Sequence, residues 1–270
     1  MKFSICTDIM YGGLNFEDKL LNIKNAGFDT IEFWGWSNKD ISKIKDAIQK
    51  NNMKISCFCL DSKNTDIMSK IGKYMLNSGA KEKLLAISKE SISVAKELGA
   101  NELIATVGDS INGLSYDEQL ENIKDSLNYV KEIFEENKIT LLVEPINRQE
   151  RRDYLTPNVK TVVDIVKDIN SEYVKALYDV YHQAMEDDFS VSEMIEALPY
   201  IGHIHIADVP GRNEPGTGII NYNEVFKALR GNGYTGYIGA EFYAKAGESI
   251  AFEVERSTKG LQATAWFWLP

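Results

Sequence analysis

Histidine and cysteine are scarce in this sequence, which has three of each among its 270 residues. The cysteines, Cys6, Cys57 and Cys59, are odd in number and lack the paired spacing of a zinc site or a disulfide framework. Cys57 and Cys59 alternate along a strand-like run, so we expect them to pack as small apolar side chains. The cysteine pattern therefore excludes a disulfide-stapled fold.

Long apolar segments and basic clusters are also missing. No run approaches the ~18–20 apolar residues that cross a membrane, and the chain opens directly on a strand-like segment rather than a signal peptide. The 30 Lys and Arg are outnumbered by 40 Asp and Glu, which gives a formal charge of −10. We therefore expect a cytoplasmic protein that binds a small molecule, because this charge disfavours nucleic acid and anionic membranes as partners.

The sequence does contain one unit repeated along its length, a short apolar strand-like run followed by an amphipathic helical run. The expected strands cover residues 3–6, 30–34, 54–60, 102–106, 139–144, 174–179, 201–207 and 237–241. The expected helices cover residues 15–26, 41–50, 81–98, 116–136, 159–169, 191–198 and 222–230, with a last helix from residue 248. Several strands are apolar throughout, which is typical of parallel strands covered on both faces.

These eight units, with no Pro/Ser-rich linker between them, predict one (β/α)8 TIM barrel over residues 1–270. A doubly wound sheet is the alternative, but no G-x-G-x-x-G follows the first strand to support it. A C-terminal tail, about residues 246–270, ends in Trp266-Phe267-Trp268. This aromatic cluster either closes the barrel bottom or forms a subunit interface, and we expect a homodimer or homotetramer.

Ionisable residues stand at the ends of the last four expected strands, where a barrel places its chemistry. These residues are Glu144, Asp179, His205 and Glu241, at intervals of 35, 26 and 36 residues, about one βα unit each. Three converging carboxylates would repel one another without a cation. Together with one imidazole, they suit Mn²⁺, Mg²⁺ or Co²⁺ better than a closed zinc site. The alternative is that each forms a separate ion pair.

The two other histidines are expected to differ in role. His203 shares a strand face with His205 but lies one layer deeper, where a hydrogen-bonded core histidine is expected. His182 follows Asp179 by three residues, on the connecting loop, and we expect it to reach bound substrate.

Several polar and aromatic residues near the same rim leave two interpretations open. Trp34 and Trp36 either pack on the C–H faces of a sugar-like ligand or pack against a neighbouring loop. Asn147 and Glu150 either bind substrate hydroxyls or belong to a solvated loop. The glycine-rich segment 215–218 is interpreted as a tight connection rather than a phosphate cradle.

The segment from Ala207 to Tyr222 reads A-D-V-P-G-R-N-E-P-G-T-G-I-I-N-Y and resembles the signature of the hydroxypyruvate isomerase family. That family belongs to the xylose-isomerase-like barrel superfamily, and residues 179–182 and 239–242 also match it. The resemblance implies that the four rim residues hold one divalent cation. It also implies that Glu144 and Glu241 act as acid/base groups and that His182 and Arg212 contact substrate oxygens.

Other residues resemble the ketose 3-epimerases. His205 stands where well-known hydroxypyruvate isomerases carry Gln, and Ile219 replaces a usual acidic residue. The Glu-Asp-His-Glu ligand set is that of the 3-epimerases, in which a glutamate matching Glu150 contacts substrate.

The resemblance implies interconversion of a small hydroxy-aldehyde and hydroxy-ketone through a cis-enediolate. The alternatives are a ketose 3-epimerase of the D-tagatose or D-allulose type and a lyase acting on a keto-sugar through the same enolate. A nuclease on this barrel is disfavoured by three histidines and the charge of −10. A non-catalytic binding barrel is the remaining alternative.

Overall fold

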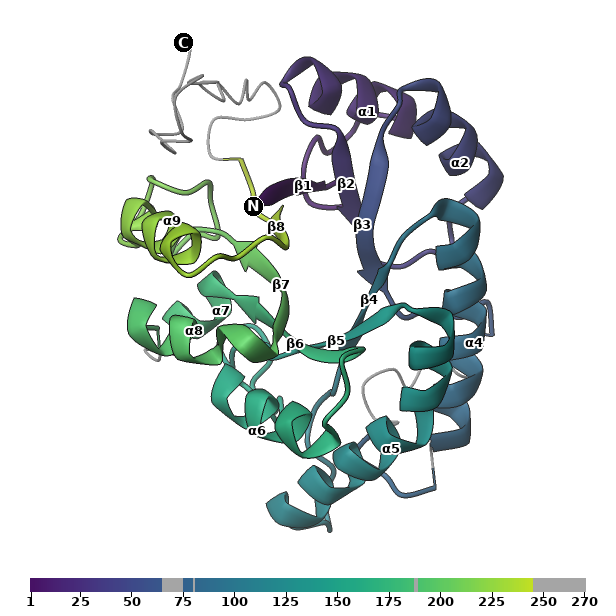
Figure 1. Ribbon diagram of the computed structural model, residues 1–270, viewed down its shortest axis with the longest axis vertical. Coiled ribbons are helices and arrows are strands. Elements are labelled where there is room, and N and C mark those ends of the chain that lie inside the picture. The colour runs from purple at the N-terminus through teal and green to yellow at the C-terminus, as the bar shows by residue number, and fades with distance from the viewer. Residues whose placement is uncertain (65–74, 80, 187–188, 245–270) are drawn as a thin grey trace.

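Eight parallel strands close into a barrel in sequence order, with β1 hydrogen-bonded to both β2 and β8 (Figure 1). The computed structural model describes residues 1–64, 75–79, 81–186 and 189–244. The strands are β1 (Lys2–Cys6), β2 (Thr30–Phe33), β3 (Lys54–Cys59), β4 (Glu102–Thr106), β5 (Thr140–Glu144), β6 (Val174–Asp179), β7 (Ile201–Ile206) and β8 (Tyr237–Ala240). The predicted (β/α)8 barrel is confirmed.

Helices surround the strands as an outer ring (Figure 1). They are α1 (Phe16–Asn25), α2 (Ile41–Lys50), α4 (Lys81–Leu98), α5 (Tyr116–Asn137), α6 (Val159–Ile169), α7 (Val180–Met185), α8 (Val191–Ala197), the 3₁₀ turn η1 (Leu198–Tyr200) and α9 (Tyr222–Gly231). None of the described helices is long and apolar enough to cross a membrane. The expected helix from residue 248 and the Trp266–Trp268 tail lie outside the described residues, so the tail and the oligomer stay predictions.

Polar side chains start several of these helices. Asn15, Asp40 and Asn158 each accept a hydrogen bond from the backbone N–H three residues later. Ser115 and Glu118 form a reciprocal capping box at the start of α5. Such caps satisfy backbone donors that have no partner within the helix.

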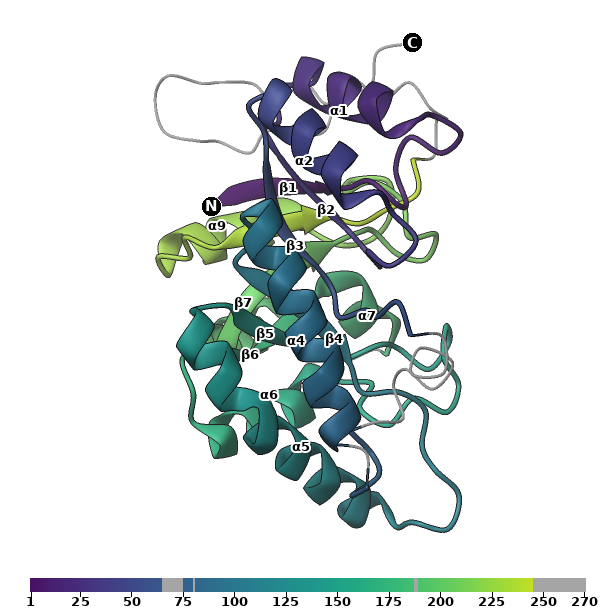
Figure 2. The ribbon, with the colours of Figure 1, turned by 90° about the vertical axis from the view of Figure 1, so that its right-hand side faces the viewer.

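The barrel interior holds both apolar and polar side chains. Cys57, Ile104, Leu142 and Leu177 form a small buried cluster of their own, separate from the large core. Cys57 is buried as predicted, but its sulfur also lies 3.7 Å from Glu32 Oε2 and 4.0 Å from His203 Nε2, so it does not pack among apolar side chains alone. Figure 2 shows the N-terminus on one side of the barrel and the long loops that follow the strands on the other. The candidate site lies on the loop side.

Candidate metal centre and active site

The structure brings the four predicted rim residues together. Glu144 and Asp179 are the last residues of β5 and β6, His205 lies in β7, and Glu241 directly follows β8. The register pairs Asp179 with His205, so these two side chains leave neighbouring strands at one level. One ligand atom from each of the four residues lies within 4.8 Å of the others, and all four side chains are buried.

His205 presents one ring nitrogen to this group. Its Nδ1 lies 3.3 Å from Glu241 Oε2 and 3.6 Å from Glu144 Oε1. This buried nitrogen makes no hydrogen bond with any described residue, which a structure normally avoids. An imidazole nitrogen and three carboxylates around one point are a donor set that Mn²⁺ or Mg²⁺ accepts. The residues present therefore fit a divalent cation.

Positive charge reaches the site from the protein itself. Arg212, on the loop after β7, lies 2.6 Å from Glu241 Oε2 and 3.9 Å from Asp179 Oδ2. Burial alone would raise the pKa of Glu241, but the charges of His205 and Arg212 and a hydrogen bond from Trp34 lower it to about 2. Glu241 is therefore ionised at neutral pH and able to bind a cation.

His205 is also shifted by its surroundings. Burial alone would lower its pKa, yet the carboxylates of Glu32 and Glu241 raise the pKa well above 6.5. The carboxylates around His205 thus stabilise a positive charge on its ring. A divalent cation would meet the same field.

His182 does not lie on a loop as predicted. It belongs to α7 and is 2 % exposed. The helix α7 begins directly after β6, where the Asp179 carboxylate accepts the backbone N–H groups of Tyr181 and His182. Its Nδ1 accepts the backbone N–H of Asn147 at 3.3 Å, so the ring proton resides on Nε2. That nitrogen lies 3.6 Å from Asp179 Oδ2, at the edge of the rim site.

Asn147 and Glu150 are engaged within the protein. Asn147 is fully buried; its Nδ2 lies 2.7 Å from His182 Nδ1 and its Oδ1 accepts the Glu150 backbone N–H. The Glu150 carboxylate accepts two hydrogen bonds from Arg212 Nη1, at 2.9 and 3.1 Å. Asn147 thus supports His182, and Glu150 holds Arg212 beside the carboxylates.

The two tryptophans after β2 have different surroundings. Trp34 is 40 % exposed and donates from Nε1 to Glu241 Oε1 at 2.5 Å. Trp36 is buried, and its Nε1 donates to Ser91 Oγ. Only Trp34 is placed at the rim; Trp36 belongs to the core.

The glycine-rich segment 215–218 is used to bind a carboxylate of the same chain. Asp208 Oδ2 accepts the backbone N–H groups of Gly216 at 2.8 Å and Gly218 at 2.9 Å, and Oδ1 accepts those of Val209 and Ile220. A Cβ on Gly218 would lie 2.0 Å from the Val209 carbonyl, so no other residue fits there. These donors are occupied, which agrees with a tight connection rather than a phosphate cradle.

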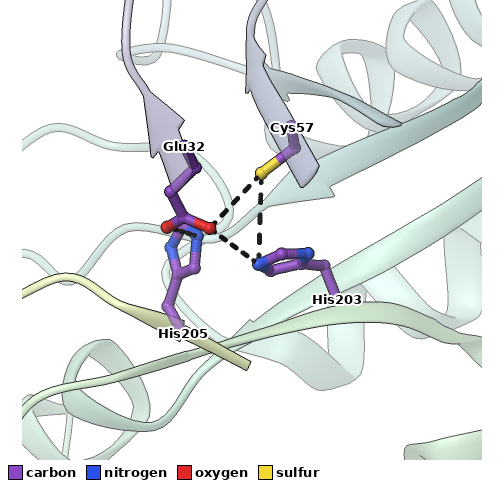
Figure 3. A group of neighbouring side chains, drawn as sticks. All are labelled: Glu32, Cys57, His203 and His205. Carbon is purple, nitrogen blue, oxygen red and sulfur yellow. Dashed lines mark hydrogen bonds and ion pairs between the residues drawn. The ribbon is translucent and has the colours of Figure 1, made fainter. Parts of the chain in front are cut away.

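A second buried group, which sequence reasoning missed, lies beneath the rim. Glu32, Cys57 and His203 gather with His205 so that one ligand atom of each lies within 4.8 Å of the others (Figure 3). His203 is fully buried and contacts Glu102 and Glu32, which confirms the expected hydrogen-bonded core histidine. A signal was present: Glu32 is the one charged residue of the buried strand Thr30–Phe33.

The fold and the converging polar rim define a class, the (β/α)8 barrels that carry their chemistry at the carboxyl ends of the strands. Comparison with known proteins narrows the class. The family model for the xylose isomerase-like TIM barrel matches residues 20–263. The chain belongs to this family.

Individual relatives agree with the family. Hydroxypyruvate isomerase from Escherichia coli K12 is 27% identical over 243 residues, which cover 90% of this chain and 93% of that protein. A 3-dehydro-D-guloside 4-epimerase from the same organism is 23% identical and covers 83% and 86% of the two chains. These relatives support an enzyme of the isomerase class, epimerases included.

Among solved structures, a family 2 AP endonuclease from Brucella melitensis superposes with a TM-score of 0.83. Its sequence is 24% identical, and the match covers 90% of this chain and 93% of that one. A likeness at this level of identity shows the shared barrel fold.

Proposed function

We propose that this protein is a divalent-metal-dependent isomerase that interconverts a small hydroxy-aldehyde and hydroxy-ketone, as its similarity to hydroxypyruvate isomerase suggests. The observation that carries the proposal is the convergence of Glu144, Asp179, His205 and Glu241, with the ligand atoms within 4.8 Å of one another. The unpartnered Nδ1 of His205 supports a cation at that point.

The metal would be held by those four residues, with Mn²⁺ or Mg²⁺ favoured by the three carboxylates and Co²⁺ also accepted. When bound, the cation would supply Lewis acidity to adjacent carbonyl and hydroxyl oxygens of the substrate. His205 and the three carboxylates would reach the cation from the ends of four consecutive strands, β5 to β8.

Glu144 and Glu241 are proposed as the acid/base pair. One glutamate removes the proton α to the carbonyl, giving a cis-enediolate of the substrate. The proton of the adjacent hydroxyl then passes to the former carbonyl oxygen, and a glutamate returns the first proton to the former carbonyl carbon. The lowered pKa of Glu241, about 2, keeps its carboxylate ionised and therefore free of a proton before the reaction begins. Arg212, 13 % exposed beside Glu241, would stabilise negative charge that develops on a substrate oxygen.

Substrate contacts are proposed for residues around the same rim. Arg212 and His182 would donate to substrate oxygens, and the exposed face of Trp34 would pack on C–H groups. Asn147 and Glu150 would act mainly by holding His182 and Arg212, whose side chains they contact.

A ketose 3-epimerase is the second candidate. His205 completes the ligand set of those enzymes, and both oxygens of Glu150 accept from Arg212 Nη1 beside the site. The same glutamates would serve it, with the proton returned to the same carbon from the opposite face. A lyase acting on a keto-sugar would start from the same proton removal.

The test is a substrate screen with Mn²⁺ added, comparing hydroxypyruvate, 2-oxo-tetronates and free ketoses, with deuterium incorporation followed by NMR. We expect exchange at the carbon α to the carbonyl, and a loss of about 10²–10⁴-fold in Glu241→Gln. Glu196→Gln, at an exposed glutamate of α8, is the matched control and should exchange like wild type.

Undiminished exchange in Glu241→Gln would remove this residue from the proposed role. No turnover of any compound by a Mn²⁺-loaded wild-type protein would overturn the isomerase proposal itself. Product chirality then separates the candidates, since a new epimer at one carbon indicates a 3-epimerase and a shifted carbonyl indicates an isomerase.

A further inference from the structure

Carboxylates and imidazoles alternate in a line from the barrel interior to the rim. Glu102 Oε2 lies 2.8 Å from His203 Nδ1, and His203 Nε2 lies 3.3 Å from Glu32 Oε2. The other oxygen of Glu32, Oε1, lies 3.1 Å from His205 Nε2. His205 then presents Nδ1 to the rim carboxylates. Figure 3 shows the Glu32 carboxylate between the two rings.

Glu32 is held firmly at this position. Its Oε2 accepts hydrogen bonds from Ser4 Oγ at 2.5 Å and Ser56 Oγ at 3.3 Å. Its side chain is only 3 % exposed, so it does not turn toward solvent. Its Oε1 has no hydrogen-bond partner among the described residues, and neither has His205 Nε2. These two atoms lie 3.1 Å apart as an ion pair, and Cys57 and His203 complete the group around them.

The neighbouring strand leaves room for this contact. A Cβ on Gly239, in β8, would lie 2.3 Å from Glu32 Oε1 and 2.7 Å from His205 Cδ2. Both distances are too short for any side chain. The approach of Glu32 to His205 thus depends on a residue without a Cβ.

An imidazole can offer a lone pair on one nitrogen while the other carries a proton. A carboxylate against Nε2 favours the proton there, which leaves Nδ1 free to bind a cation and fixes the ring plane. Removing such a partner from a metal-binding histidine typically weakens metal affinity or activity by about 10–100-fold.

We propose that Glu32 is a positioning residue that holds His205 with Nδ1 toward the metal centre, and that it is itself anchored by His203 and the two serines. The inference rests on the proposed function, because it assumes a cation at the rim. A separate metal bound by Glu32, Cys57 and His203 fits less well, since Glu32 Oε2 already accepts from Ser4.

The first test measures Mn²⁺ affinity by isothermal titration calorimetry. We expect one ion per chain in wild type and about 10–100-fold weaker binding in Glu32→Ala. Glu32→Gln keeps an acceptor of the same shape and should recover most of the lost affinity. Asp61→Asn is the matched control, because Asp61 is a buried carboxylate whose hydrogen bonds go to the backbone of Ser37 and Ser62. It should bind Mn²⁺ like wild type even if it is less stable.

The second test needs no paramagnetic metal and no activity. Because the chain has three histidines, ¹H–¹⁵N NMR of histidine-labelled protein gives few ring signals, and a His203→Asn spectrum assists assignment. We expect a slowly exchanging Nε2 proton of His205 with and without Mg²⁺. It should persist in Glu32→Gln and disappear in Glu32→Ala.

The outcomes separate the two proposals. If Glu32→Ala binds Mn²⁺ as tightly as wild type and keeps the Nε2 proton, the positioning role is overturned while the metal site stands. If wild type binds no divalent cation, the proposed function fails, and the NMR signal in metal-free protein still decides whether Glu32 holds His205. Two ions per chain, with one lost in both Glu32→Ala and Cys57→Ala, would overturn the positioning role in favour of a second metal site.

Discussion

The two halves of the barrel contribute differently to its chemistry. Strands β5 to β8 deliver the four rim residues that face one another at the mouth. Strands β1 to β4 deliver side chains that lie beneath them. Glu32 contacts His205 directly, and Ser4, Cys57 and Glu102 contact Glu32 or His203.

The partners of each side chain show this difference. Glu144 and Asp179 are the last residues of their strands and lie beside Glu241 and His205 at the mouth. Glu32 and His205 are each one residue before the end of their strands, and Glu32 contacts His205, His203 and two serines rather than the mouth. We call β5 to β8 the ligand half, because the proposed function assigns their rim residues to the cation. We call β1 to β4 the support half, because Glu32 and Glu102 contact His205 and His203.

The largest effect is expected when one negative charge is removed from the ligand half. In Asp179→Asn, the amide oxygen still caps α7 through the backbone N–H groups of Tyr181 and His182, but the negative charge is lost. We expect turnover and Mn²⁺ affinity each to fall by at least about 100-fold, the upper end of the loss typical when a supporting partner is removed, with little change in melting temperature. Steady-state kinetics and calorimetry measure the two losses.

The control is Asp40→Asn, which makes the same change at the N-cap of α2 on the surface. It should leave both kinetics and affinity unaltered. A large drop in the melting temperature of Asp179→Asn with retained affinity would show that Asp179 serves the helix rather than the metal.

A smaller effect is expected from the support half. Gly239→Ala places a methyl group where Glu32 Oε1 and His205 Cδ2 now lie, at 2.3 and 2.7 Å. The carboxylate must move away from the ring, so we expect a loss of Mn²⁺ affinity of about tenfold, similar to Glu32→Ala. Combining the two substitutions should add little, since both break one contact. Fully additive losses in this double variant would show that they act separately.

The convergence of the four rim residues could be predicted from sequence, and the contacts of the support half could not. Glu144, Asp179, His205 and Glu241 recur at about one βα unit, and a parallel barrel brings strand ends to one rim. Contacts between Glu32 and His205 join β2 to β7 across the interior, and no local spacing encodes such a pair. The helix α7 was missed for another reason: its cap, Asp179, is also a rim residue.

A smaller effect is expected on the pH dependence of the free energy of unfolding. The pKa of Glu241 is lowered from 4.5 to about 2 in the folded protein, so its ionised form stabilises the fold above pH 4.5. That contribution is lost as the pH falls from about 4.5 through about 2. We expect the unfolding free energy of metal-free wild type to fall more steeply over this range than that of Glu241→Gln. Urea titrations at several pH values measure it, and parallel curves for the two proteins would contradict the assigned shift.

The smallest effect is expected at the N-terminus of α5, a helix that carries none of the rim or supporting residues. Ser115 caps α5 and exchanges hydrogen bonds with Glu118 on the protein surface. Ser115→Ala leaves one backbone donor without its side-chain partner, which costs about 1 kcal/mol and lowers the melting temperature by ~2–4 °C. Because α5 supplies no ligand and no supporting carboxylate, Mn²⁺ affinity and turnover should match wild type. A change in either would mean that helix ends influence the rim, and that the division between ligand and support strands describes only part of how the site is held.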